Sequence, residues 1–99
     1  MNSTNITRSN AGVITVSGEL VFDKVVALLK ISNQYFDGSS TLLFNLHGVV
    51  KTDSAGLALL VEWTRLAFQK GQAINFCDVP KQLLDIARVS GLDDLLPIV

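Results

Sequence analysis

The sequence has one cysteine, Cys77, and one histidine, His47. A single cysteine excludes an internal disulfide framework and favours a reducing compartment. These two residues alone cannot supply a zinc site, and no Cys/His spacing typical of such a site occurs. The sequence therefore predicts no metal centre, and we expect no cofactor. Cys77 ends an apolar stretch and is interpreted as a small buried hydrophobic residue.

An excess of charge of one sign and a long apolar run are also missing. Eight Lys and Arg residues stand against nine Asp and Glu residues, for a formal net charge of −1. The scattered basic residues indicate no binding of nucleic acid or of an anionic membrane. No apolar stretch approaches the ~20 residues that cross a bilayer, and the polar residues 1–5 do not resemble a signal peptide. We expect a cytoplasmic protein without direct membrane insertion.

Hydrophobic residues make up 48% of the sequence and charged residues 17%, enough for a sizeable core in one domain over residues 1–99. Apolar periodicity predicts a β-β-α-β-α-β-α order and an α/β fold with a mixed, mostly parallel sheet of about four strands. Residues 34–41 are expected to form a loop. The expected strands cover 6–8, 13–17, 42–46 and 73–77, and the expected helices cover 22–33, 54–70 and the segment from Pro80 to the stop at Ser90 and Gly91.

Apolar spacing also predicts which faces are buried. The stretch 42–46 has a pattern suited to burial on both faces of a parallel sheet. The four residues expected on the buried face of the first helix are Phe22, Val25, Val26 and Leu29. The expected core face of the second helix consists of Leu57, Leu60, Val61, Thr64 and Phe68. We further expect the tail residues Leu92, Leu95, Leu96 and Ile98 to pack against the domain.

The second helix has a further apolar stripe formed by Leu59, Trp63 and Leu66. Its apolar arc is therefore wider than one buried face normally requires. One interpretation is that a neighbouring helix of the same layer covers the stripe. The other is a partner surface with Trp63 as its anchor, since tryptophan is enriched among interface hot spots.

Polar residues cluster where the third strand gives way to the second helix. Thr52, Asp53 or Ser54 can serve as the N-cap of this helix. Gly56 can permit tight packing in its first turn, and no phosphate-binding glycine motif is present. Asp53 and Ser54 with His47 could form a nucleophile pair, but no oxyanion arrangement or third orienting group can be named. We therefore favour a docking surface that could be regulated by phosphorylation of Ser54.

The segment D-S-A-G-L-A-L-L at 53–60 resembles the signature of STAS domains. Three further segments resemble the stand-alone MlaB-type branch, and together they cover nearly the whole chain. These are S-G-E-L at 17–20, G-Q-A-I-N-F-C-D-V-P at 71–80 and A-R-V-S-G-L-D-D-L-L-P at 87–97. The resemblance implies a compact STAS-like domain with helices mainly on one face of the sheet, and a role that is not enzymatic.

The MlaB-type resemblance implies a cytoplasmic subunit that binds and supports the ATPase of an ABC transporter for phospholipids. That complex also contains a permease and an MCE protein and would hold this chain at the inner membrane. The expected partner-binding residues are Thr52, Asp53, Ser54, Ala55, Gly56 and Trp63. The alternative is an anti-sigma factor antagonist switched by phosphorylation of Ser54, because antagonists share the Asp-Ser pair. A small esterase ranks far last.

Overall fold

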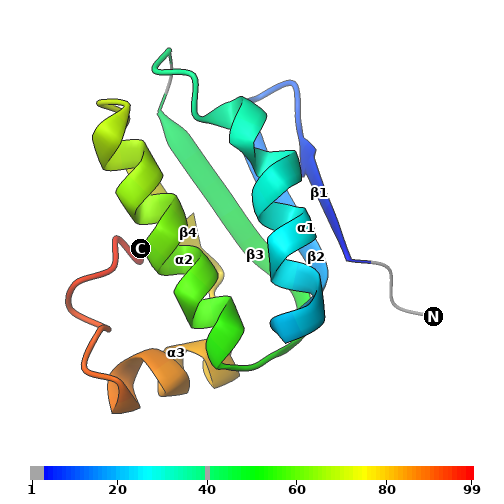
Figure 1. The fold of residues 1–99 in the computed structure, drawn as a ribbon, viewed down its shortest axis with the longest axis vertical. Helices are drawn as coiled ribbons and strands as arrows, with labels where there is room; N and C mark the ends of the chain where they lie inside the picture. The colour runs from blue at the N-terminus through cyan, green and yellow to red at the C-terminus, as the bar shows by residue number, and fades with distance from the viewer. Residues whose placement is uncertain (1–3, 40) are drawn as a thin grey trace.

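The computed structural model describes residues 4–39 and 41–99. Residues 1–3 of the polar start and Ser40 of the predicted loop lie outside the described residues. The elements follow the predicted order, with one short 3-10 helix, η1, added after the first helix (Figure 1). In chain order they are β1 (Asn5–Arg8), β2 (Val13–Leu20), α1 (Phe22–Ser32), η1 (Asn33–Tyr35), β3 (Leu42–Thr52), α2 (Ser54–Gln69), β4 (Ile74–Cys77) and α3 (Lys81–Val89).

The four strands form one mixed sheet in the order β1-β2-β3-β4. β1 and β2 are antiparallel, whereas β2, β3 and β4 run parallel to one another. Crossovers between neighbouring parallel strands are right-handed, so two successive ones place their helices on the same face. Figure 1 shows α1 and α2 side by side over one face of the sheet. The predicted α/β fold, the mixed and mostly parallel sheet, and the order of strands and helices along the chain are confirmed.

The strands bury one face of the sheet. Along β3, the side chains of Leu42, Phe44 and Leu46 are buried, whereas Leu43 and Asn45 are half-buried. Successive residues of a strand point to opposite faces, so this alternation marks one covered face and one open face. The prediction that residues 42–46 are buried on both faces is therefore wrong. Both helices of the parallel crossovers lie on the same face, which leaves the other uncovered in the described chain.

An aromatic cluster fills the space between α2 and the sheet. The ring of Trp63 lies 4.5 Å from that of Phe44, and Phe44 lies 5.8 Å from Phe76. All three side chains are fully buried. The indole N–H of Trp63 donates a 2.8 Å hydrogen bond to Ser32 Oγ at the end of α1. The sheet, α1 and α2 therefore share one core, and the interpretation of Trp63 as an exposed anchor is wrong.

The predicted buried faces of the two long helices are only partly correct, since Leu57 and Leu60 of α2 are buried and Val25 and Leu29 of α1 pack against the core. In α1, Phe22 and Val26 are exposed, whereas Leu28 and Ser32 are buried. In α2, Phe68 is 87% exposed although we expected it in the core. An apolar arc wider than the contact surface can face the core in more than one orientation, and the neighbouring elements select one.

The C-terminal segment packs along β4. The amide of Phe76 donates to the Pro97 carbonyl at 2.9 Å, and the Val99 amide donates to the Phe76 carbonyl at 2.9 Å. Leu96 is buried, and Leu92 and Ile98 pack against the core, as predicted. Leu95 is 72% exposed, so the prediction is wrong for this residue.

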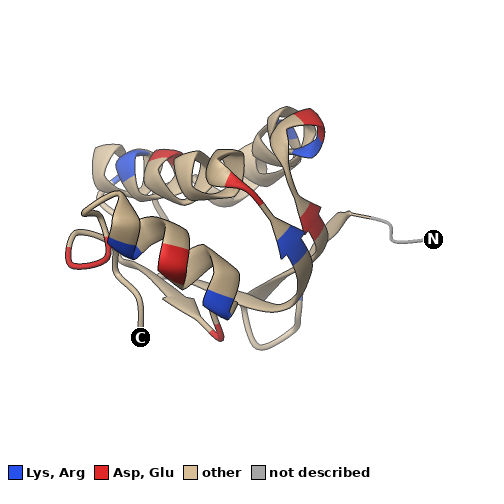
Figure 2. Cartoon of the chain, turned by 90° about the horizontal axis from the view of Figure 1, so that it is seen from below, with Lys and Arg blue, Asp and Glu red and all other residues tan. Residues whose placement is uncertain are grey.

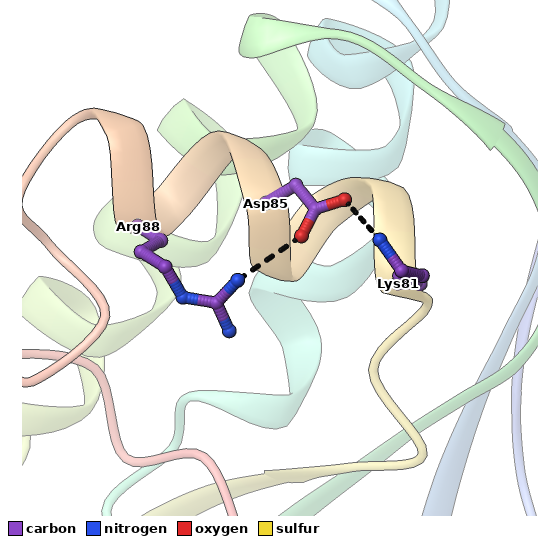
Figure 3. A network of polar contacts seen from close by, with 3 residues as sticks. All are labelled: Lys81, Asp85 and Arg88. Carbon is purple, nitrogen blue, oxygen red and sulfur yellow. Dashed lines mark hydrogen bonds and ion pairs between the residues drawn. The ribbon is translucent and has the colours of Figure 1, made fainter.

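The outer surface of α3 carries a charged network (Figure 3). Asp85 accepts from Lys81 Nζ at 2.8 Å and from Arg88 at 3.2 Å. The hydrogen bond from Lys81 is the main reason that the pKa of Asp85 lies below its ordinary value. These exposed ion pairs lie on the solvent side of α3, and Leu83 and Ala87 on its other side are buried. None of the described helices is long and apolar enough to span a bilayer.

Candidate functional site

The start of α1 and the start of α2 meet at one edge of the sheet. Leu20 at the end of β2 pairs with Thr52 at the end of β3, after two irregularities in the β2–β3 register. Each helix begins two residues after this pair, at Phe22 and Ser54. In open α/β sheets, binding sites lie outside the carboxyl ends of the strands. β3 extends to Thr52, well beyond the predicted end at residue 46, and this extension brings the two helix starts together.

One carboxylate holds both helix starts. Asp53 is the N-cap of α2, and its Oδ1 accepts a 2.8 Å hydrogen bond from the amide of Ala55. Its Oδ2 accepts a 3.2 Å hydrogen bond from the amide of Phe22, the first residue of α1. The N-cap of α1, Val21, makes no side-chain capping bond of its own. Because the first amides of a helix lack intrahelical partners, Asp53 satisfies one such donor in each helix.

Thr52 and Gly56 support this junction from beneath. The side chain of Thr52 is buried, and its Oγ1 donates a 3.0 Å hydrogen bond to the carbonyl of Leu20. A Cβ added to Gly56 would collide with Thr52 Oγ1 and lie 2.9 Å from the Leu20 carbonyl oxygen. The packing interpretation of Gly56 is therefore the correct one. The prediction that Thr52, Gly56 and Trp63 belong to the partner-binding surface is wrong, because all three side chains or positions are buried.

Ser54 is the exposed member of the predicted set, and Ala55 is half-buried beside it. Both line a groove of about 440 Å³ between α1 and α2. We call it the α1–α2 groove; its lining residues are Phe22, Val25, Val26 and Leu29 of α1 with Ser54, Ala55, Ala58, Leu59 and Glu62 of α2. Most of this lining is apolar, and two of its side chains, Phe22 and Val26, are 80% and 62% exposed.

The apolar face of α1 that was predicted to be buried lies partly against the core and partly in this groove. The four α1 residues that line the groove are the same four whose spacing predicted a buried face. Their periodicity was correctly recognised as an apolar helix face. The position of α1 beside α2 packs Val25 and Leu29 against the core, as predicted, and leaves Phe22 and Val26 exposed in the groove.

The lining of the groove includes one charged residue. Glu62, its one lining carboxylate, accepts hydrogen bonds from Arg65, and this contact lowers the pKa of Glu62. Glu62 therefore stays ionised at neutral pH while its charge is balanced by Arg65. The surface next to Ser54 consequently suits an apolar partner segment with few charges.

The residues required for a catalytic pair are not assembled. His47 lies five residues before the end of β3, about 16 Å of extended strand from Thr52. The thiol of Cys77 is held mainly protonated, because burial and the neighbouring Asp78 raise its pKa. Cys77 is half-buried, not fully buried as predicted. Among residues 4–39 and 41–99, no group of three or more potential metal ligands occurs.

Comparison with known proteins gives one family match and several similar folds. A family model described as "Mlab, STAS domain" matches residues 4–97. No curated protein matches the sequence. Among solved structures, a putative anti-sigma factor antagonist from Thermotoga maritima superposes with a TM-score of 0.74 at 14% identity, covering 96% of this chain and 84% of that one.

Three further structures share the fold. An anti-sigma factor antagonist from Mycobacterium paratuberculosis gives a TM-score of 0.74 at 22% identity, covering 99% of this chain and 85% of that one. Unphosphorylated SpoIIAA gives 0.72 at 19% identity, covering 98% and 86%. SLC26A9 gives 0.59 at 17% identity, covering 84% of this chain but 16% of that chain. The family model spans nearly the whole sequence, and the chain therefore belongs to the MlaB-type STAS domain family.

Proposed function

We propose that this chain is a non-enzymatic accessory subunit that binds and supports the ATPase of a phospholipid-transporting ABC complex. Membership of the MlaB-type STAS family supports this function, because STAS domains generally act in regulation and protein interaction. The observation that carries the proposal is the α1–α2 groove, with the exposed Ser54 at its mouth. The permease and the MCE protein of the complex would then hold the chain at the inner membrane, on its cytoplasmic side.

The groove suggests how the ATPase is bound. An apolar segment of the ATPase packs against Val26 and Ala58, and a polar group of the ATPase hydrogen-bonds the Ser54 hydroxyl. Asp53 fixes the separation of the two helix starts, so the groove exists before the partner arrives. Binding one arrangement of the ATPase better than another shifts its population toward that arrangement. This mechanism needs no chemistry on the part of the subunit.

Copurification and ATPase turnover test the proposal. The chain is co-expressed with the ABC ATPase of the same organism, and Val26→Asp is compared with Val89→Asp. Val26 lines the groove, whereas Val89 is 89% exposed on α3, away from it. We expect Val26→Asp to abolish copurification and the effect on turnover, and Val89→Asp to retain both. If the unmodified chain binds no such ATPase, the proposal fails.

An anti-sigma factor antagonist is the second candidate, and the exposure of Ser54 favours it. A kinase can reach this hydroxyl, and phosphate would add a charge of about −1.5 to −2 next to the Asp53 carboxylate. The added charge would oppose binding of a partner to an apolar groove. This function predicts stoichiometric phosphate on Ser54 after incubation with a cognate kinase, detected by intact mass. It also predicts loss of partner binding in Ser54→Asp but not in Ser54→Ala.

A further inference from the structure

The two halves of α1 are held in different ways. Its second half is anchored in the core, because Leu28 and Ser32 are buried and the Ser32 hydroxyl accepts the indole N–H of Trp63 at 2.8 Å. Its first half, residues 22–27, contains no buried side chain. Among these residues, Val25 is the one that packs against the core. The core therefore fixes the end of the helix and leaves its beginning weakly held.

A carboxylate from another helix start holds the first turn of α1. Val21, the N-cap of α1, makes no side-chain capping bond, and the Phe22 amide donates to Asp53 Oδ2 at 3.2 Å. Figure 2 shows an acidic residue where β3 passes into α2, beside the first turn of α1. A charged acceptor makes this hydrogen bond stronger than one between neutral groups. Among residues 4–39 and 41–99, no other hydrogen bond joins residues 22–27 to α2.

Weak anchoring of this kind permits local opening. Proteins open in units, and the units with few buried apolar contacts and exposed hydrogen bonds open most readily. Phe22 and Val26 are 80% and 62% exposed, and the hydrogen bond from Phe22 to Asp53 is itself exposed. We propose that residues 22–27 form a flap that opens by local unfolding, and that the Asp53–Phe22 hydrogen bond is its latch. The buried Leu28 marks the point where the flap joins the fixed half of the helix.

Opening of the flap changes the α1–α2 groove. In the closed state, Phe22, Val25 and Val26 form much of one wall of the groove, opposite Ser54 and Ala58. In the open state this wall is lost, and an apolar partner segment has less surface to contact. A partner of the groove therefore binds the closed state and shifts the population toward it. This last step rests on the proposed function, whereas the flap and its latch are properties of the chain alone.

Two substitutions at one position isolate the latch. Phe22→Pro removes the amide N–H that donates to Asp53, and Phe22→Ala is the matched control that removes the same ring but keeps the N–H. Proline is favoured at the first position of a helix. Val21 already has the extended backbone that precedes a proline, with φ −123° and ψ 168°. Loosening of the flap in Phe22→Pro relative to Phe22→Ala therefore measures the lost hydrogen bond.

Amide hydrogen exchange followed by NMR measures the opening in the free chain. In the unmodified protein, we expect the amides of Val25 and Val26 to exchange faster than the amide of Ser32. In Phe22→Pro they should exchange about tenfold faster than in Phe22→Ala, near the low end of what a hydrogen bond to a charged group contributes. Exchange of the Ser32 amide should be the same in both variants, because the second half of α1 stays in the core.

Substitution of the acceptor tests the same hydrogen bond from its other end. Serine caps a helix about as well as aspartate, but its single oxygen cannot serve both helix starts. In the Phe22→Ala background, Asp53→Ser should speed exchange of Val25 and Val26. In the Phe22→Pro background it should add no further increase, because the latch is already absent. Unchanged exchange of the Leu57 amide verifies that the start of α2 remains capped.

Saturation with the ABC ATPase of the same organism tests the coupling of the flap to the groove. If the partner selects the closed state, the difference in exchange between Phe22→Pro and Phe22→Ala should vanish in the complex. A difference that persists at saturation would refute the coupling. An ATPase that does not bind would refute the proposed function and not the flap, which is measured without a partner.

Three results in the free chain would overturn the flap and its latch. Val25 and Val26 could exchange as slowly as Ser32 in the unmodified protein. Phe22→Pro and Phe22→Ala could exchange at equal rates, which would show that the hydrogen bond does not hold the flap. Asp53→Ser could speed exchange equally in both backgrounds, which would show that Asp53 acts through α2 instead.

Discussion

Trp63 and Phe68 lie close together on α2, yet the first is fully buried and the second is 87% exposed. From the apolar pattern, we expected Phe68 in the core and considered Trp63 as a surface anchor. Both residues belong to one wide apolar arc, and the arc alone does not say which part meets the sheet. The comparison shows that the position of α1 and of the sheet decides burial along this helix.

The surroundings of the two side chains explain the difference. Trp63 packs on Phe44, and its N–H reaches Ser32 Oγ, which in turn donates to the Leu29 carbonyl at 3.0 Å. The one polar atom of the indole is thus paired inside the core, which makes full burial favourable. Phe68 faces the hollow beside the C-terminal segment, where nothing in the described chain covers it.

Alanine substitution of Trp63 and of Phe68 should give the largest difference in the free energy of unfolding. Trp63→Ala should lower the free energy of unfolding by about 3–5 kcal/mol, because it leaves a large cavity among the aromatic rings. Phe68→Ala should change it by no more than about 0.5 kcal/mol, as is typical of exposed positions. Urea denaturation monitored by circular dichroism measures both. Equal losses for the two variants would contradict the assigned orientation of α2.

Gly56 and Ser54 give the same contrast of buried and exposed positions at the other end of the helix. Gly56→Ala should cost about 1–3 kcal/mol, because the new methyl group collides with Thr52 Oγ1 and the Leu20 carbonyl. Ser54→Ala should be nearly neutral for stability. In a double-mutant cycle, adding Thr52→Ala removes the nearest obstacle, so the two losses should be less than additive. Strict additivity would argue against the predicted collision.

Asp53 is half-buried, and the cost of replacing it should lie between the costs of replacing Gly56 and Ser54. Asp53→Ala should cost about 0.5–2 kcal/mol, since it leaves the amides of Ala55 and Phe22 without their carboxylate acceptor. Asp53→Asn keeps one acceptor oxygen and should cost less. Thermal denaturation of the unmodified chain, Asp53→Asn and Asp53→Ala measures the order of their stabilities. If Asn is as costly as Ala, capping is not the main role of this residue.

The exposed network on α3 should give the smallest effect. The pKa of Asp85 is lowered, chiefly by its hydrogen bond from Lys81, so the carboxylate is stabilised in the folded state. This contribution is complete above the ordinary Asp pKa of 3.8 and is lost as pH falls through the lower folded value. Asp85→Asn should therefore reduce slightly the acid dependence of thermal stability below about pH 4. An unchanged acid profile would show that the network contributes nothing measurable.

Much of the fold could be predicted from local patterns. The order of strands and helices followed from periods of two and about 3.6 residues, which depend only on neighbouring residues. The helix N-cap was predicted among Thr52, Asp53 and Ser54, and Asp53 has this role. The second bond of Asp53, to the amide of Phe22, could not be predicted, because it depends on the pairing of Leu20 with Thr52.

The location of the candidate surface could be predicted from the sequence, but most of the residues that form it could not. The sequence directed attention to Ser54, which is exposed, and to Ala55, which lines the groove. It assigned Thr52, Gly56 and Trp63 to the same surface, although all three support it from inside. It also placed Phe22 and Val26 in the core, whereas they line the open groove.

The sequence by itself determined the order of the four strands and three α-helices and the α/β class, because hydrophobic spacing and capping act over a few residues. Only the tertiary structure decided which apolar faces are covered, because burial depends on segments far apart in the chain. Packing of α2 against the sheet and α1 enclosed Trp63, whereas Phe22 and Phe68 remained exposed. Two helices on one face of the sheet also left the other face open within residues 4–39 and 41–99, which no local pattern in β3 could reveal.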